Sequence, residues 1–182
     1  MPSYPIHTIA TAPEQARPVL EQLEKTFGVV PAIAGAMANS PELIKAFAGL
    51  FQQVHSGTFT EAEIQTLLLT NAVANSCDWA VAFHTLLALK EGLTPADVEA
   101  IRGRGVPADR RLAALSGLAR MLIETRGHVG DDDLDAFVAA GFRREQALEL
   151  LAVTAASTIT NYAGTMARPP LEDFLRPHAW RA

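Results

Sequence analysis

The stretch 60–92 limits what this chain can fold into more than any other segment does. Thr60 is followed three residues later by Glu63, which is the pattern of a capping box at a helix start, and Gly92 ends the stretch. A long uncharged run lies between these signals and holds the only cysteine, Cys77. We predict two helices that meet at Asn75-Ser76, with the rest of the chain organised around them.

Length and composition favour a single all-α domain. The chain has 182 residues, which suits one domain able to bury roughly 70 % of its unfolded surface. Its residues are 49 % apolar but only 7 % aromatic. Alanine and leucine predominate over β-branched residues, a composition typical of closely packed helices.

Local start and stop signals predict a succession of further helices. Ser40-Pro41 is an N-cap followed by proline at the first helical position, and Thr94-Pro95 repeats this pattern. Prolines and the lack of a helical period predict an extended arm over 1–15, followed by one helical domain over 16–182. The expected helices span about 16–27, 41–56, 61–75, 77–91, 95–103, 109–126 and 131–140, with a long last helix after Gly141.

The sequence also matches itself weakly when it is shifted by 83 residues. The tetrad Cys77-Asp78-Trp79-Ala80 then aligns with Thr160-Asn161-Tyr162-Ala163. This pattern predicts two repeat-like halves, around 59–92 and 142–170, of which only the first carries reactive side chains. Chance similarity between two alanine-rich helices is the alternative explanation.

Charge and cysteine content argue against several function classes. The net charge of −5 arises from 20 acidic and 15 basic residues without a Lys/Arg block, so we expect no nucleic-acid partner. One cysteine forms no intrachain disulfide, and the start of the chain lacks a signal-peptide pattern, so we expect a cytoplasmic protein. The uncharged run 150–167 has the length of a membrane span but carries polar side chains throughout: Thr154, Ser157, Thr158, Thr160, Asn161 and Thr165. We expect it to be a buried helix, in the domain centre or against another subunit.

Three motifs in 60–92 resemble the core of the carboxymuconolactone decarboxylase and alkylhydroperoxidase D-like (AhpD-like) family. That core carries Glu-x-Glu, then Cys-x-x-Cys, then a histidine four residues after the second cysteine. The corresponding residues of this chain are Glu63-Ile64-Gln65, Cys77-Asp78-Trp79-Ala80 and His84. The resemblance covers about 14–175 and implies an AhpD-like helical fold with an internally duplicated core, assembled as a dimer, trimer or hexamer.

Two departures from the family pattern affect the same reaction. In the peroxidase branch the two cysteines cycle between dithiol and disulfide while the histidine and the second glutamate relay protons. Here Ala80 replaces the second cysteine and Gln65 replaces that glutamate. Without a second thiol no intramolecular disulfide can form, and an amide does not transfer protons at neutral pH. Glu61, one turn before Gln65, or Glu63 is left as the candidate replacement for the carboxylate.

Cys77 is the candidate nucleophile. We place it in the first turn of its helix after Ser76 as N-cap, where the helix N-terminus favours a thiolate. Asp78 adds negative charge that opposes a thiolate. The alternative is a buried, unreactive cysteine, since free cysteine is among the most buried residue types.

His84 is the candidate acid/base. It follows Cys77 by seven residues, which predicts one helix face and a separation of about 10 Å along the axis. Its side chain is expected to lean toward Ala80, where a methyl group leaves space for a water or a ligand atom. A hydrogen-bonded core histidine is the alternative, as aromatic core packing is for any aromatic pocket wall. The candidate substrate-binding residues are Gln65, Glu61, Trp79, Ala80 and Tyr162.

The patterns and the resemblance together predict a carboxymuconolactone decarboxylase-like enzyme for a small molecule, with His84 as acid/base in an apolar pocket. One alternative is a one-cysteine alkylhydroperoxidase with peroxiredoxin-like activity, in which Cys77 is oxidised and an external thiol resolves it. Another is an oligomeric binding or scaffold protein whose site has decayed. We expect no metal and no cofactor, because the histidines are scattered and no glycine-rich phosphate loop occurs. We expect no membrane partner either.

Overall fold

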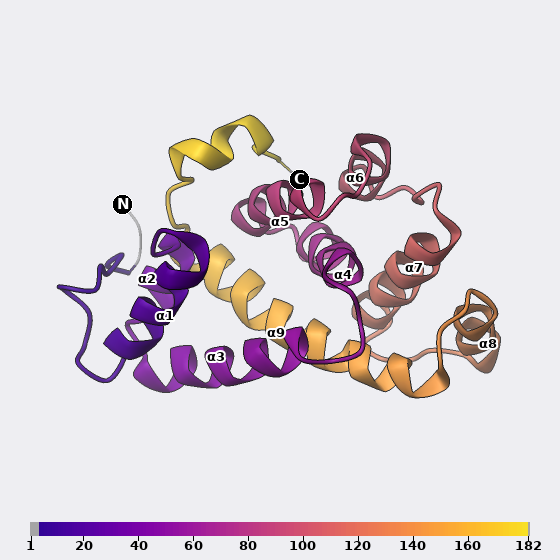
Figure 1. Cartoon of the computed structure of the whole chain (residues 1–182), viewed down its shortest axis with the longest axis horizontal. Coiled ribbons are helices and arrows are strands. Elements are labelled where there is room, and N and C mark those ends of the chain that lie inside the picture. The colour runs from indigo at the N-terminus through magenta and orange to yellow at the C-terminus, as the bar shows by residue number, and fades with distance from the viewer. Residues whose placement is uncertain (1–3, 182) are drawn as a thin grey trace.

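The computed structural model describes residues 4–181, which form nine α-helices and one 3-10 helix (Figure 1). No strand occurs within this range, so the prediction of an all-α single domain is confirmed. None of these helices combines the length and apolar character needed to cross a bilayer. The helices are α1 (Arg17–Phe27), α2 (Ala32–Met37), α3 (Pro41–His55), α4 (Glu61–Ala74), α5 (Asp78–Lys90), α6 (Pro95–Arg102), α7 (Arg110–Glu124), α8 (Asp131–Ala139), α9 (Arg144–Ala167) and the 3-10 helix η1 (Asp173–His178).

Helix α4 is the centre of the molecule. Every residue from 63 to 73 is buried, so α4 has no solvent-facing side over most of its length. A helix of this kind is stable only when other helices surround it, and α5, α7 and α9 pack directly against α4 (Figure 1). The prediction that the chain is organised around this segment therefore agrees with the structure.

Three apolar clusters form the core. The first joins α5 to α6 and η1 and includes Trp79 and Leu175. The second lies between α4, α7, α8 and α9 and includes Leu67 and Phe137. The third holds α1, α2 and α3 together through side chains such as Leu20. Because α4 and α9 border more than one cluster, the three behave as one continuous core.

Most helix ends lie where the sequence signals predicted them. Ser40, Thr60 and Thr94 each cap a helix through a side-chain oxygen that accepts a backbone N–H bond. The start of α5 differs from the prediction. The N-cap is Cys77 and not Ser76, which lies outside the helix with a φ of 51°. Cys77 is consequently in extended backbone before the first turn, and its side chain does not follow the α5 face.

The two proposed halves start alike but continue differently. The capping box of α4 joins Thr60 to Glu63, and a box at the equivalent place in α9 joins the backbone of Arg143 to Gln146. Helices α4 and α5 are separated by a break at 75–77. Helix α9 runs unbroken through the matching positions, 158–160. The proposed duplication thus aligns two helices with one, and it stays a prediction.

The segment before α1 is held against α2. The backbone N–H of His7 donates to the carbonyl oxygen of Gly35 over 3.1 Å, and the amide of Asn39 donates to that of Pro5. Ala12 is buried as well. Residues 1–3 of the predicted arm lie outside the described range, and the division into arm and domain stays a prediction.

Close contact between α9 and the start of α5 depends on Gly164. A Cβ atom at this position would lie 2.8 Å from Sγ of Cys77 and 3.1 Å from Cδ1 of Ile33. We expect Gly164→Ala to lower the free energy of unfolding by about 1–3 kcal/mol, because the added methyl group overfills this contact. Urea denaturation measures the change.

The matched control is Gly117→Ala on α7, where an added Cβ meets no atom within 4 Å. It should raise the free energy of unfolding by up to about 1 kcal/mol, since alanine favours a helix interior over glycine. Equal effects of the two substitutions would contradict the tight contact at Gly164.

Candidate functional site

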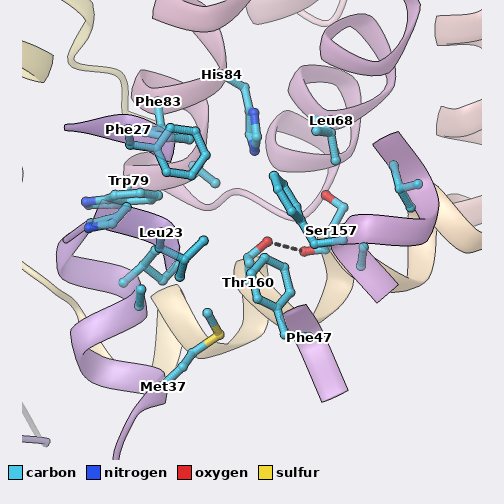
Figure 2. A pocket seen from close by; sticks show the side chains of 17 residues that line it. Leu23, Phe27, Met37, Phe47, Leu68, Trp79, Phe83, His84, Ser157 and Thr160 are labelled. Atoms are coloured by element: carbon cyan, nitrogen blue, oxygen red, sulfur yellow. Dashed lines mark hydrogen bonds between the residues drawn. The ribbon is translucent and has the colours of Figure 1, made fainter. Parts of the chain in front are cut away.

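An apolar pocket opens between α5 and the helices that face it. Its cavity volume is about 50 Å³, a third of the ~150 Å³ cavity that admits benzene in an engineered protein. A ring-sized ligand would therefore require some of the lining side chains to move. The walls come from α1, α2, α3, α4, α5 and α9 and include Phe27, Met37, Phe47, Phe51, Trp79, Ala80, Phe83, His84, Ser157 and Thr160 (Figure 2).

His84 is held in one orientation by Gln65. Nδ1 of His84 lies 3.0 Å from Oε1 of Gln65, and both side chains are buried. A carbonyl oxygen only accepts, so Nδ1 carries the hydrogen and Nε2 keeps its lone pair. No other hydrogen-bond partner of His84 occurs in the described part of the chain. Nε2 is therefore the atom that His84 offers to a ligand.

Burial keeps His84 neutral. Removal from water lowers the pKa of His84 from 6.5 to about 3, and the charge of nearby His55 adds to this shift. A carboxylate at position 65 would favour the imidazolium form, whereas the amide of Gln65 does not. At neutral pH the imidazole is thus a base and an acceptor, and it becomes an acid only after it has taken up a proton.

Two hydroxyl side chains lie across the pocket from His84. Ser157 and Thr160 of α9 are on the side opposite His84 (Figure 2). Ser157 Oγ accepts a bond from the amide of Asn161, and the Thr160 hydroxyl donates to the Ser157 carbonyl. No pattern in the sequence indicated that Ser157 and Thr160 line the pocket, because nothing in 150–167 showed which face of this helix meets α5.

Cys77 does not share the pocket with His84. It lines a separate hollow of about 350 Å³ together with Asp78, Thr165 and Arg168. The expectation of one common helix face is wrong, because Cys77 precedes the first turn of α5. Burial raises the pKa of the Cys77 thiol above 9, although bonds from the Ala80 backbone and the Thr165 side chain act in the opposite direction. The thiol is 2 % exposed and stays protonated at neutral pH.

The other candidate residues divide between the pocket and its surroundings. Trp79 and Ala80 line the pocket, and Trp79 Nε1 also donates to Glu172 over 2.8 Å. Glu61 instead contacts His55, with its carboxylate 2.9 Å from Nδ1. Tyr162 is 58 % exposed and is absent from the pocket lining. Of the predicted set, the structure thus brings together Gln65, His84, Ala80 and Trp79.

No charged side chain lines the pocket among residues 4–181, and Arg168 lies at the separate Cys77 hollow. Within the same range, no three His, Cys, Asp or Glu side chains gather closely enough to hold a metal ion. The pocket therefore presents one base, two hydroxyl groups and an apolar wall.

Comparison with known proteins relates the central helices to a family. Residues 41–121 match the sequence profile of the carboxymuconolactone decarboxylase family. This match spans α3 to α7, including Gln65, Cys77 and His84. Over this segment, a little under half of its length, the chain is similar to the carboxymuconolactone decarboxylase family. Among proteins of curated function, none matches this chain in sequence.

Solved structures resemble the fold over nearly the whole chain. The chain is similar to an uncharacterized peroxidase-related protein with an alkylhydroperoxidase AhpD core from Ralstonia eutropha JMP134 (TM-score 0.83, 20 % identity, 96 % of this chain and 94 % of that one). A peroxidase-related protein from Silicibacter sp. TM1040 gives a TM-score of 0.78 at 17 % identity, over 95 % and 92 % of the chains. A cysteine-to-alanine variant of the debrominase Bmp8 in complex with 2,3,4-tribromopyrrole gives 0.74 at 18 %, over 96 % and 94 %. At these identities the likeness concerns the AhpD-like fold.

Proposed function

We propose that this protein is a carboxymuconolactone decarboxylase-like enzyme in which His84 delivers a proton to the carbon that loses carbon dioxide. The observation that carries the proposal is that His84 is the only titratable side chain on the pocket wall within residues 4–181. Its Nε2 has no protein partner among them, while Gln65 holds Nδ1. A positioned imidazole with one free nitrogen is a common proton-transfer group in enzymes.

The low pKa of His84 determines how an acidic substrate would bind. A carboxylate that enters an apolar pocket without a cation loses its hydration and gains no counter-charge. It would therefore enter together with one proton from solvent, which Nε2 of His84 takes up. The negative charge of the substrate raises the pKa of His84 from its low value of about 3. The bound pair of carboxylate and imidazolium is then neutral as a whole.

The reaction step follows from this pair. The bond between the ring carbon and the carboxylate breaks, carbon dioxide leaves, and the electron pair stays on the ring carbon. The proton on Nε2 of His84 moves to that carbon, so His84 returns to its neutral form. One solvent proton is consumed in each turnover. Gln65 accepts the Nδ1–H bond throughout and keeps the ring in place.

A relative supports a ring-shaped substrate. The variant of Bmp8 whose fold this chain shares holds 2,3,4-tribromopyrrole, a small heteroaromatic ring. The pocket of this chain has mainly aromatic and aliphatic walls, with hydroxyl groups on the side opposite His84. A flat ring with one polar substituent at each end matches that distribution.

A one-cysteine hydroperoxide reductase is the second candidate. It is favoured by the hollow of about 350 Å³ at Cys77, where Thr165 and the Ala80 backbone contact the thiol. The raised pKa of Cys77 opposes it, because the thiolate and not the thiol attacks peroxides. We therefore place it behind the decarboxylase-like reaction.

The test is carbon dioxide release from carboxymuconolactone by wild-type protein and by His84→Gln. We expect His84→Gln to lower kcat/KM by about 100-fold or more, because it removes the proton donor. For the wild type, kcat/KM should fall about tenfold per pH unit between pH 6 and pH 8, since the protonated form of free His84 becomes scarcer.

Cys77→Ser is the matched control and should release carbon dioxide at the wild-type rate. The same three proteins are then assayed for thiol-dependent reduction of an alkyl hydroperoxide. A fast reduction that Cys77→Ser abolishes, without carbon dioxide release, would replace the decarboxylase-like proposal with the second candidate. Carbon dioxide release that persists in His84→Gln would remove His84 from the mechanism.

A further inference from the structure

Trp79 separates two cavities of the protein. Among the described residues, it alone lines both the pocket of His84 and the hollow at Cys77. The two cavities also lie close together on their other sides. A Cβ atom on Gly164, in the wall of the hollow, would lie 3.1 Å from Cδ1 of Ile33, in the wall of the pocket. A turn of the Trp79 ring would therefore join the pocket to the hollow.

Two contacts hold the Trp79 side chain in place. Its ring is stacked on the ring of Phe83 at the edge of the pocket (Figure 2), with 4.9 Å between the ring centroids and 19° between the ring planes. Its Nε1 donates a hydrogen bond of 2.8 Å to Glu172. A hydrogen bond to a carboxylate is stronger and more directional than a ring contact. The bond to Glu172 therefore fixes the orientation of the indole.

Glu172 is itself placed by the segment that follows α9. Its second carboxylate oxygen accepts the backbone N–H of Ala32, the first residue of α2, over 2.8 Å. Pro169 and Pro170 come shortly before Glu172, and their fixed φ angles stiffen this segment. One carboxylate thus links the start of α2, the first turn of α5 and the segment after α9.

The position of Trp79 in α5 leaves its side chain free to turn. Trp79 is the second residue of α5, and the two residues before the helix are not helical, since φ is 51° at Ser76 and the backbone of Cys77 is extended. In a helix interior, the preceding turn blocks one of the three χ1 rotamers. No helical turn precedes Trp79, so this restriction is absent once the bond to Glu172 breaks.

We propose that Trp79 is a gate between the pocket of His84 and the Cys77 hollow, that Glu172 holds this gate closed, and that opening the gate creates the ligand site. The closed pocket has a volume of about 50 Å³ and the hollow one of about 350 Å³. A benzene ring occupies a cavity of ~150 Å³. A ring therefore fits beside His84 only when the two cavities are joined, and Glu172 is the positioning residue that controls this space.

The two parts of the joined cavity suit different parts of a ligand. The pocket of His84 has mainly aromatic and aliphatic walls, which suit an apolar ring. The hollow carries Asp78, Thr165 and Arg168, which suit a polar substituent. The ligand class is thus a ring compound with a polar substituent that extends past Trp79. The proposal rests on the proposed function only in taking the pocket of His84 as the substrate site, and binding without turnover tests it separately.

The first test is the affinity for fluorobenzene, an apolar ring whose binding is followed by fluorine NMR. Glu172→Ala should lower the dissociation constant about tenfold, because a ligand that binds only the open gate gains affinity as the open fraction rises. Damage to the pocket wall would have the opposite effect and weaken binding. Trp79→Phe removes the N–H donor but keeps an aromatic ring, and it should also bind fluorobenzene more tightly than wild type.

Two further variants show where the space for the ring comes from. Arg102 holds the end of the chain through the carbonyl oxygens of His178 and Ala179. Arg102→Met releases these contacts but not the bond to Trp79, so it should keep the wild-type dissociation constant. Thr165→Phe places a ring in the hollow, and in combination with Glu172→Ala it should cancel the gain in affinity.

The second test is the accessibility of the Trp79 ring to a quencher. Trp180→Phe leaves Trp79 as the only tryptophan of the chain. In this background acrylamide should quench the fluorescence weakly, because Trp79 is 7 % exposed. Adding Glu172→Ala should raise the quenching constant by about threefold or more, since the ring then spends more time in the open position.

Four results would overturn the proposal. If Glu172→Ala and Trp79→Phe bind fluorobenzene no more tightly than wild type, or if none of the proteins binds it, Trp79 is a fixed wall. An unchanged quenching constant in Glu172→Ala leads to the same conclusion. An equal gain in Arg102→Met would assign the effect to the whole C-terminal segment. A gain that survives Thr165→Phe would show that the pocket does not open into the hollow.

Discussion

Acidification from pH 6.5 to about pH 4 should lower the free energy of unfolding by about 3 kcal/mol through His84 alone. The pKa of His84 is 6.5 in an unfolded chain and about 3 in the folded protein. Between these values the unfolded state binds a proton that the folded state does not bind. The contribution of His84 to the free energy of unfolding is therefore fully present above pH 6.5, and it is lost progressively as the pH falls toward 3. Urea denaturation at a series of pH values measures the slope.

His84→Gln should remove this part of the pH dependence, because glutamine does not titrate and still offers a partner to Gln65. His128→Gln is the control, since His128 is an exposed residue in the loop between α7 and α8. It should keep the wild-type slope. If His84→Gln lost stability with acid as steeply as wild type, His84 would not be the buried neutral base that the proposed reaction requires.

Arg111→Ala should lower the free energy of unfolding by about 3 kcal/mol, because it leaves the Glu63 carboxylate buried without a counter-charge. The Glu63 side chain is 7 % exposed and forms an ion pair with Nε of Arg111. The same guanidinium donates to the carbonyl oxygen of Gly141 and lies 3.7 Å above the ring of Phe142. Because the Arg111 side chain is itself 41 % exposed, we expect the loss in the free energy of unfolding to lie at the lower end of the range for buried pairs. Thermal or urea unfolding checks the value.

Two further variants separate the buried charge from the lost contacts. Glu63→Gln combined with Arg111→Met should be more stable than Arg111→Met alone, since a neutral amide at position 63 costs less to bury than a carboxylate. Arg143→Ala, which breaks an exposed pair with Glu145, should change stability by less than about 1 kcal/mol. An Arg111→Ala protein as stable as Arg143→Ala would contradict the role assigned to Glu63.

The helices and the centre of the fold could be predicted from the sequence because their signals are local. The capping box of Thr60 and Glu63 starts α4 as expected, and Gly28 ends α1 in a left-handed conformation. The uncharged run that follows Glu63 correctly indicated that the other helices are arranged around α4. The start of α5 was misplaced by one residue. That single residue decided where Cys77 points, because an N-cap side chain lies off the helix face.

Of the candidate site, the sequence predicted only residues that lie on α4 and α5. Gln65 and His84 meet as their family motif implied. Phe27, Phe47 and Ser157 come from helices distant in the chain, and no spacing rule links them to His84. Tyr162 faces solvent because α9 packs against α3 and α4 with one side and leaves its other side in water.

The sequence by itself thus determined most helix boundaries, the central place of α4 and the candidate base, since each depends on residues within a few turns of one another. Only the tertiary structure decided that His84 is neutral, that Cys77 is in a different hollow and that one face of α9 is uncovered. These properties depend on contacts between segments that are far apart in the chain, such as Cys77 Sγ with Thr165 and Trp79 with Glu172. For the neutral state of His84 the physical cause is removal from water, which no local pattern of residues encodes.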